Sequence, residues 1–492
     1  MVKDVRVCDK PYSTNLIESL RWAQIANSLC RVHTWPSSIM TERINPGTNI
    51  KSMDTDSWEM YMMLEKYRDA TPSSSLLWNR AIGLFCGGVN HNVRTYGLDK
   101  FGAYPPYIAR GDGSHIWDVD GNEYVDWWTT HYAQILGHNN AIVREALAEQ
   151  IGNGIHFGGL NEKMVILAEM LKDGVPFLEK MRFCSTGAEA TMYSIRLARL
   201  FSKKKLVAKT MGGWHGGNDS LAYHLKSPYT DGPFFDGVSF NFNDRKSFDN
   251  LMKEHDQDLA AVIIEPILGA GGALPPDPDY LQYLREETEK REILLVFDEI
   301  ITGFRFSYGS AGQKEFGVIP DLITLGKIVG GTMHLGVYGG REDIMRLAAP
   351  GAEGGRWVGG GTFSSHPLAM TAGCATLSQL KEKKGEYDSL NKRCTDFKNE
   401  INLIFEEHQF KALSTGYGSL VFIHALHNRL DEPPRTGTDI GKELDFDALD
   451  KFQSLLMQEG IFGYHGLGAM SFSHTKEDID KTLGAIRAVV TS

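Results

Sequence analysis

Short apolar runs alternate with helical stretches between about residues 160 and 345, and this alternation constrains the fold more than any other feature of the sequence. The runs are apolar on both faces, as expected for strands of a sheet that helices cover on both sides. We expect strands at MRFC (181–184), KLVAK (205–209), AAVIIE (260–265), ILLVFD (293–298), DLITL (321–325) and LGVYG (335–339). The pattern predicts an α/β protein with a mostly parallel central sheet.

Polar and glycine-rich residues follow five of these six runs. Parallel sheets bind their ligands beyond the carboxyl ends of the strands, where such residues meet. These strand ends carry Ser185-Thr186-Gly187, Gly212-Gly213-Trp214-His215, Glu265-Pro266, Asp298-Glu299 and Gly326-Lys327. Packing alone does not explain five ends of this kind, so we expect a ligand site at this edge of the sheet.

Charge and cysteine content exclude several classes of protein. The 492 residues carry a formal net charge of −11, whereas nucleic-acid binding needs a basic face. The basic stretch RLARLFSKKK (196–205) is typical of a solvated helix end. None of the six cysteines forms a CxxC pair, so we expect neither a disulfide framework nor a metal site.

The N-terminal sequence MVKDVRVCDK mixes both charge signs and lacks an apolar signal core. No uncharged apolar run approaches the ~20 residues that a membrane span needs. Together with the cysteine content, these features predict a cytoplasmic protein with no membrane partner.

Three strand ends carry residues suited to one kind of chemistry. The stretch STGAEATMYSIRLAR (185–199) starts a helix at Thr186 and Gly187, where free N–H groups and the helix dipole suit a phosphate; an ordinary N-cap is the alternative. Asp298 ends an apolar strand, where its carboxylate needs a cation or a donor, although a structural ion pair would serve. Lys327 follows the next strand between glycines, where it is either a surface lysine or a partly desolvated, nucleophilic amine.

The three features together match pyridoxal phosphate. This cofactor needs a lysine for a Schiff base, an acidic partner for its pyridinium nitrogen and an anchor for its phosphate. Lys327, Asp298 and the turn at 186–188 supply one of each.

Beyond this constellation, the chain resembles the class III (subgroup II) pyridoxal-phosphate aminotransferases of fold type I from about residue 78 to its C-terminus. It is similar above all to glutamate-1-semialdehyde aminomutases and β-amino-acid aminotransferases. The resemblance is carried by CGGVNHNVR, DVDGNEYVDW, LGHNN, STGAEA, WHG, IIEPILGAGG, VFDEIITGFR, TLGKIVGG, GTFSSHPLAM and SHTKEDID.

The resemblance implies a role for each residue that matches these motifs. Lys327 would form the Schiff base, Asp298 would pair with the pyridinium nitrogen, and an aromatic residue would stack on the cofactor ring. Arg94 would hold the substrate carboxylate, and Thr362 would reach the phosphate of a neighbouring subunit, which implies a homodimer with active sites at its interface. The other cofactor-binding positions are Thr186, Gly187, Ala188, Trp214 as the stacking residue, His215 and Glu265.

Three departures from the aminomutases concern the substrate side. Ala270 stands where they have the asparagine of EPVAGN, His131 replaces the tryptophan of GSWGP, and His334 replaces the proline of GGGxPxG. We therefore favour an aminotransferase that moves an amino group between an amino acid and a keto acid, with β- and aromatic amino acids as the candidate donors. The alternatives are a glutamate-1-semialdehyde aminomutase, an amino-acid racemase or epimerase, and a non-catalytic relative, which the presence of both Lys327 and Asp298 disfavours.

The sequence also predicts a division into domains. Residues 1–75 form an N-terminal extension of unknown role, and residues 131–367 form a large cofactor-binding domain. Residues 76–130 and 368–492 contribute to a smaller α+β domain, whose last helix is expected to start at an N-cap box made by Thr475 and Asp478.

Overall fold

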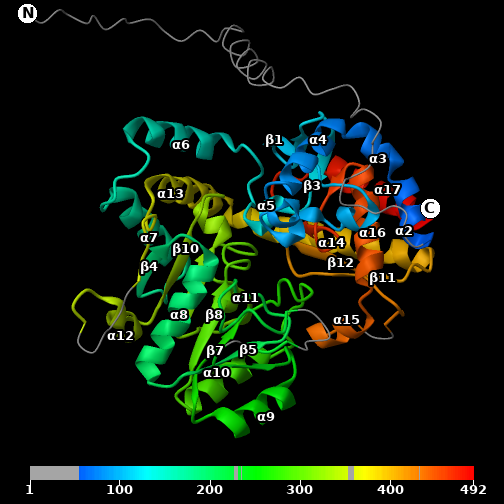
Figure 1. The fold of residues 1–492 in the computed structure, drawn as a ribbon. Helices are drawn as coiled ribbons and strands as arrows, with labels where there is room; N and C mark the ends of the chain where they lie inside the picture. The colour runs from blue at the N-terminus through cyan, green and yellow to red at the C-terminus, as the bar shows by residue number, and fades with distance from the viewer. Residues whose placement is uncertain (1–54, 226–230, 234, 353–358, 431–432, 492) are drawn as a thin grey trace, which may run out of the picture. The chain divides into compact units, whose positions relative to one another are not determined.

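A seven-stranded sheet occupies the middle of the chain, with the strand order β4-β10-β9-β8-β7-β5-β6 (Figure 1). In chain order its strands are β4 (Lys180–Cys184), β5 (Leu206–Thr210), β6 (Gly237–Phe240), β7 (Leu259–Ile264), β8 (Leu294–Glu299), β9 (Leu322–Gly326) and β10 (Gly336–Gly340). Strands β6, β5, β7, β8 and β9 are parallel to one another, whereas β10 is antiparallel to both β9 and β4. The predicted mostly parallel sheet is confirmed, and each of the six predicted runs forms a strand.

The computed structural model describes residues 55–225, 231–233, 235–352, 359–430 and 433–491. Most of the expected N-terminal extension, residues 1–54, therefore lies outside the described residues. All described residues belong to one compact unit, Ile50–Ser492. The expected division of this unit at residues 130 and 367 stays a prediction. Across the described ranges, no helix is long and apolar enough to cross a membrane.

Helices cover both faces of the large sheet because successive strand residues are apolar. On β7, Ile263 packs in the cluster beneath α8 (Gly187–Ser202). Its neighbour Val262 faces the opposite way and packs with residues of α9 (Arg245–His255) and α10 (Tyr280–Lys290). The sheet is therefore buried on both sides, and its polar residues collect at the strand ends.

A second sheet brings together distant parts of the chain. Its order is β1 (Ile108–Asp112), β2 (His115–Asp118), β3 (Glu123–Asp126) and β13 (Ile461–Phe462). Strands β2 and β3 form a hairpin, in which Gly121 has a φ of 91°. Strand β13 pairs in parallel with β3, so the C-terminal part of the chain returns to the N-terminal hairpin.

The C-terminal part adds helices around a small antiparallel sheet. The sheet has the order β11-β12-β14. These elements are α13 (Pro367–Glu382), α14 (Tyr387–Glu407), β11 (Ala412–Thr415), β12 (Leu420–Ala425), α15 (Gly437–Glu443), α16 (Phe446–Gln458), β14 (Gly468–Ala469) and α17 (Lys476–Thr491).

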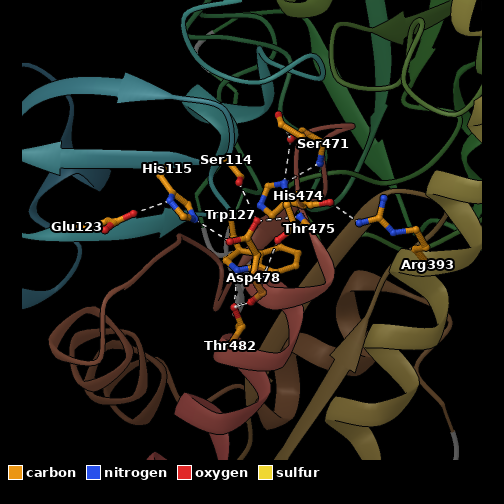
Figure 2. Close-up of polar contacts among 11 residues, drawn as sticks. Ser114, His115, Glu123, Trp127, Arg393, Ser471, His474, Thr475, Asp478 and Thr482 are labelled. Atoms are coloured by element: carbon orange, nitrogen blue, oxygen red, sulfur yellow. Dashed lines mark hydrogen bonds and ion pairs between the residues drawn. The ribbon is translucent and has the colours of Figure 1, made fainter.

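Asp478 ties the last helix to the N-terminal hairpin (Figure 2). Thr475 N donates to its Oδ2 at 2.8 Å while Asp478 N donates to Thr475 Oγ1 at 3.2 Å, which is the predicted N-cap box. The ring of His115 lies 2.7 Å from Oδ1, and Trp127 Nε1 donates to Thr482 Oγ1 at 2.9 Å. Although burial raises the pKa of Asp478, hydrogen bonds from Thr475 and His115 bring it below its usual value. These contacts fix the end of β3, from which the chain enters the candidate site.

Candidate active site

Asp298, the penultimate residue of β8, is buried and held by three donors. The His215 Nδ1 atom lies 2.8 Å from its Oδ2, and Thr324 Oγ1 donates to Oδ1 at 3.0 Å. The backbone N–H of Ile300 donates to the same Oδ1 at 3.1 Å. Asp298 and Thr324 are paired residues of β8 and β9, so the sheet register itself sets this contact. The carboxylate has a fixed orientation in which it can stabilise a protonated ring nitrogen.

Lys327 follows β9 and begins the short 3-10 turn η6 (Lys327–Gly330) with a φ of 47°. Burial lowers the pKa of its amine to about 8, and the charges of Asp298 and Glu265 oppose this decrease. About a tenth of such amines are unprotonated at pH 7, far more than of ordinary lysines. The position therefore suits a nucleophilic amine.

The glycines around Lys327 make room for backbone and for side chains of the protein. A Cβ on Gly326 would lie 3.0 Å from the Ile300 side chain, and one on Gly331 would lie 2.5 Å from the Ala372 carbonyl oxygen in α13. Close packing of η6 against α13 therefore explains the glycine after the turn.

The first turn of α8 lies against the same isoleucine. Thr186 is the N-cap and its Oγ1 accepts from Glu189 N at 3.2 Å. A Cβ on Gly187 would lie 2.9 Å from the Ile300 side chain. Within the described part of the chain, the N–H groups of Gly187 and Ala188 have no hydrogen-bond partner. Free N–H groups at the start of a 16-residue helix can bind an anion.

Glu265 holds the loop that carries Trp214. Its Oε1 accepts from Trp214 N at 3.0 Å and its Oε2 accepts from Gly269 N at 3.1 Å. Burial, with the nearby charge of Asp298, raises the pKa of Glu265 to about 8. Trp214 is 37% exposed, so its indole is accessible to a ligand.

Arg94 and His131 lie near each other on the N-terminal side of the site. Arg94 is exposed on the 3-10 turn η4 (Asn92–Thr95). Burial lowers the pKa of His131 to about 3, and the charges of Lys327, His91 and Arg94 contribute. The His131 ring is therefore neutral and close enough to Lys327 to sense its charge.

Thr362 forms no hydrogen bond with these residues. It is exposed in a loop before α13, and no other described residue forms a hydrogen bond with it. The described contacts bring together Lys327, Asp298 and Glu265, whereas none of them links Thr362 to this group.

His131 belongs to a backbone feature that the sequence did not predict. The residues Thr129–Tyr132 (α5) form one left-handed turn, with φ values of 47°, 53°, 61° and 63°. Each non-glycine residue in this region costs about 1–2 kcal/mol, so the turn persists only where tertiary contacts hold it. One such contact comes from Arg305, a fully buried residue whose Nη2 donates to the Tyr132 carbonyl oxygen.

Sequence reasoning missed Arg305, Thr324 and Lys209. Thr324 and Arg305 lie inside the motifs DLITL and VFDEIITGFR, where a polar residue in or after an apolar strand was the available signal. Lys209 ends the predicted run KLVAK, is fully buried and donates from Nζ to the Tyr223 carbonyl oxygen at 2.6 Å. Burial lowers the pKa of Lys209 to about 8.

Comparisons with known proteins identify the family and the fold. The profile of the family "Aminotransferase class-III" matches residues 102–421. Glutamate-1-semialdehyde 2,1-aminomutase of Thermodesulfovibrio yellowstonii is 36% identical over 432 residues, covering 84% of this chain and 98% of the relative. An ω-transaminase from Sphaerobacter thermophilus is 31% identical with a TM-score of 0.78, covering 87% of this chain and 99% of that one.

A β-phenylalanine aminotransferase from Variovorax paradoxus is 30% identical with a TM-score of 0.79, covering 88% of this chain and 96% of that one. The resemblance noted in the sequence motifs is confirmed over most of the chain, and so is the expected fold of pyridoxal-phosphate-dependent transferases of fold type I. The chain belongs to the class III aminotransferase family.

Proposed function

We propose that this aminotransferase holds pyridoxal phosphate at the strand ends and moves an amino group between an amino acid and a keto acid. The observation that carries the proposal is the convergence on Ile300: its N–H binds Asp298, and its side chain lies against Gly187 and Gly326, the residue before Lys327. A carboxylate, an anion-binding turn and an amine of lowered pKa thus surround one residue.

The residues fit the cofactor. The unpartnered N–H groups of Gly187 and Ala188 would take its phosphate, and the Trp214 indole would stack on its ring. Asp298 would face the ring nitrogen, with His215 and Thr324 fixing the carboxylate. His215 Nε2 is buried and has no protein partner among the described residues, so one polar atom beside the site is left for a ligand or a water molecule.

Lys327 performs two tasks in this proposal. When bound, pyridoxal phosphate supplies an aldehyde for covalent attachment and a ring that accepts an electron pair from the substrate carbon. The Lys327 amine would hold the cofactor covalently until a substrate amine takes its place. The freed Nζ would then act as an acid and base toward the substrate carbon, because an amine of pKa about 8 exchanges protons readily near neutral pH.

Two observations bear on the choice between transfer to a second substrate and transfer within one molecule. Relatives that are 36% identical are named glutamate-1-semialdehyde 2,1-aminomutase, which supports the intramolecular alternative. Ala270 and His131, which stand where the aminomutase motifs have an asparagine and a tryptophan, favour the aminotransferase. The β-phenylalanine aminotransferase at 30% identity supports a β- or aromatic amino acid as donor.

We also propose a cytoplasmic homodimer with Thr362 completing the phosphate site of the partner subunit. Helices α6 (Ala141–Asn153) and α7 (Glu162–Gly174) pack on α13 and, with the segment between them, leave a run of apolar side chains exposed. These are Ile142, Ile151, Ile155, Phe157, Leu160 and Val165. An apolar face of this kind supports burial against a second copy of the chain.

The test combines a donor panel with the Lys327→Ala variant. Wild-type protein loaded with pyridoxal phosphate should lose its cofactor absorbance band when an amino-acid donor is added, and a keto acid should restore it. Borohydride should fix cofactor to the wild type but not to Lys327→Ala. Fixation in the variant would show that Lys327 is not the attachment point. A response to glutamate-1-semialdehyde or diaminovalerate alone would favour the aminomutase.

A further inference from the structure

The left-handed turn Thr129–Tyr132 is held by contacts from three directions. Arg305 donates from Nη2 to the Tyr132 carbonyl oxygen and from Nε to the Ile301 carbonyl oxygen at 2.9 Å. The Tyr132 hydroxyl lies 2.6 Å from His465 Nδ1. At the other end, Thr129 N donates to Asp126 Oδ1 at 3.0 Å. A turn with four unfavourable backbone conformations is thus fixed by residues from distant parts of the chain.

The turn sets the direction of one side chain, His131. Thr129 and Tyr132 are buried, whereas the His131 ring is half-buried and stacks on Trp128 at 4.8 Å between centroids and 27° between planes. The ring of His91 meets it edge-on at 5.5 Å.

The same turn lies beside the lysine end of β9. Thr130 lines a cavity of about 450 Å³ together with Ile328, the residue after Lys327. The Lys327 charge also contributes to the lowered pKa of His131. The turn therefore lies next to η6, and the charge of Lys327 reaches His131.

An unmatched positive charge stands next to His131. Arg94 has no ion pair or hydrogen bond with any other described side chain, and its charge acts on both His91 and His131. Two imidazoles and an exposed guanidinium lie together, and the charge of Lys327 reaches one of them, His131. Such a region attracts a carboxylate, and a neutral imidazole offers it one N–H donor.

We propose that His131 is a specificity-determining residue that donates a hydrogen bond to the substrate carboxylate beside Arg94, and that the left-handed turn held by Arg305 positions it. The inference rests on the proposed function, because the carboxylate belongs to the amino and keto acids. It goes further in assigning the selection of carboxylate-bearing substrates to the backbone conformation of residues 129–132.

Substitutions at two positions separate the side chain from the turn. His131→Ala removes the donor, whereas His131→Asn keeps an N–H and tolerates the left-handed conformation. Thr130 is exposed, so Thr130→Pro opposes a φ of 53° without touching the core, and Thr130→Gly accepts that φ. Each position thus has a disruptive variant and a matched control.

The assay measures binding of 3-phenylpropanoate and 2-phenylethylamine to the purified full-length chain by titration calorimetry. We expect His131→Ala and Thr130→Pro to weaken 3-phenylpropanoate binding by about tenfold or more, because a hydrogen bond to a charged group is lost. Binding of 2-phenylethylamine should change less than threefold. His131→Asn and Thr130→Gly should bind the carboxylate within about threefold of the wild type.

Unchanged carboxylate binding by His131→Ala would overturn the proposal, as would no binding to the wild type. Equal losses in Thr130→Gly and Thr130→Pro would refute the role of the turn. If Thr130→Pro does not fold, the two His131 variants decide alone. Borohydride fixation of the cofactor, measured in parallel, reports on Lys327 and separates a failure of the proposed function from a failure of this inference.

Discussion

Gly216 lets its loop pass directly against the start of α8, and its replacement tests the proposed phosphate turn. Its φ is 85°, and a Cβ there would lie 2.5 Å from the Cβ of Ala188 and 2.6 Å from its Cα. Contacts this short involve backbone, so either the loop or the first turn of α8 must move. Gly217 is a matched control, because a Cβ there meets nothing within 4 Å.

We expect Gly216→Ala to lower the free energy of unfolding by roughly 2–4 kcal/mol. About 1 kcal/mol comes from a left-handed alanine and about 1–3 kcal/mol from the overpacked contact. Moving the Ala188 N–H also weakens a hydrogen bond to phosphate, which predicts about tenfold weaker retention of pyridoxal phosphate.

Urea unfolding of the apoenzyme and titration with pyridoxal phosphate measure the two effects separately. The reasoning is refuted if Gly216→Ala equals the wild type in both measurements, or if Gly217→Ala is impaired to the same extent.

Two further predictions concern Lys327 and the proposed dimer. Burial lowers the pKa of Lys327 to about 8, and the protonated amine does not react. The rate at which the apoenzyme binds pyridoxal phosphate covalently should therefore rise about tenfold per pH unit below pH 8 and level off above it. A rate that keeps rising to pH 10, measured by stopped-flow absorbance, would contradict this prediction. Leu160 is 89% exposed in the single chain and should be buried between the subunits of the proposed dimer. Leu160→Glu should therefore give monomers by light scattering, whereas the control Leu403→Glu, on the exposed face of α14, should remain dimeric. A dimeric Leu160→Glu protein would argue against this interface.

The strands of the large sheet could be predicted because their physical signal is local. Runs such as AAVIIE are apolar at every position, and β7 is buried along its whole length. Strand β6 gives no such signal, since Gly237, Val238 and Ser239 are only partly buried. The antiparallel direction of β10 could not be predicted either, because the sequence LGVYG is equally compatible with a parallel and an antiparallel strand.

The stretch at residues 69–75 shows a local signal that misleads. Proline and three serines suggest a loop, yet Pro72 begins the helix α4 (Pro72–Ile82). Proline is favoured at the first helical position, where its missing N–H is not needed. The N–H groups of Ser73 and Ser74 donate to the carboxylate of Asp120 at 2.6 and 2.9 Å, so a residue of the hairpin turn stabilises the helix start.

Part of the candidate site could be predicted from the sequence and part could not. The sequence predicts that Lys327, Asp298 and the 186–188 turn meet, because they follow strands of one mostly parallel sheet. Their roles stay predictions. The left-handed turn does not follow, because TTHY contains no glycine and its local preferences oppose that conformation. What stabilises it lies 173 residues away, at Arg305, and 333 residues away, at His465.

The carboxylate of Asp298 affects the pKa values of two buried groups near it, Lys327 and Glu265. The charge of Asp298 raises the pKa of both Lys327 and Glu265. Burial is the main cause of the raised pKa of Glu265, which reaches about 8. Burial acts in the opposite direction on the amine and prevails, since its pKa still falls to about 8. If only the charge of Asp298 acted on the amine, its pKa would be high and it would stay protonated and unreactive. If only burial acted, its pKa would be too low for the amine to carry a proton near neutral pH. Burial and the charge of Asp298 together give Lys327 a pKa at which it can both react as a free amine and carry a proton near neutral pH.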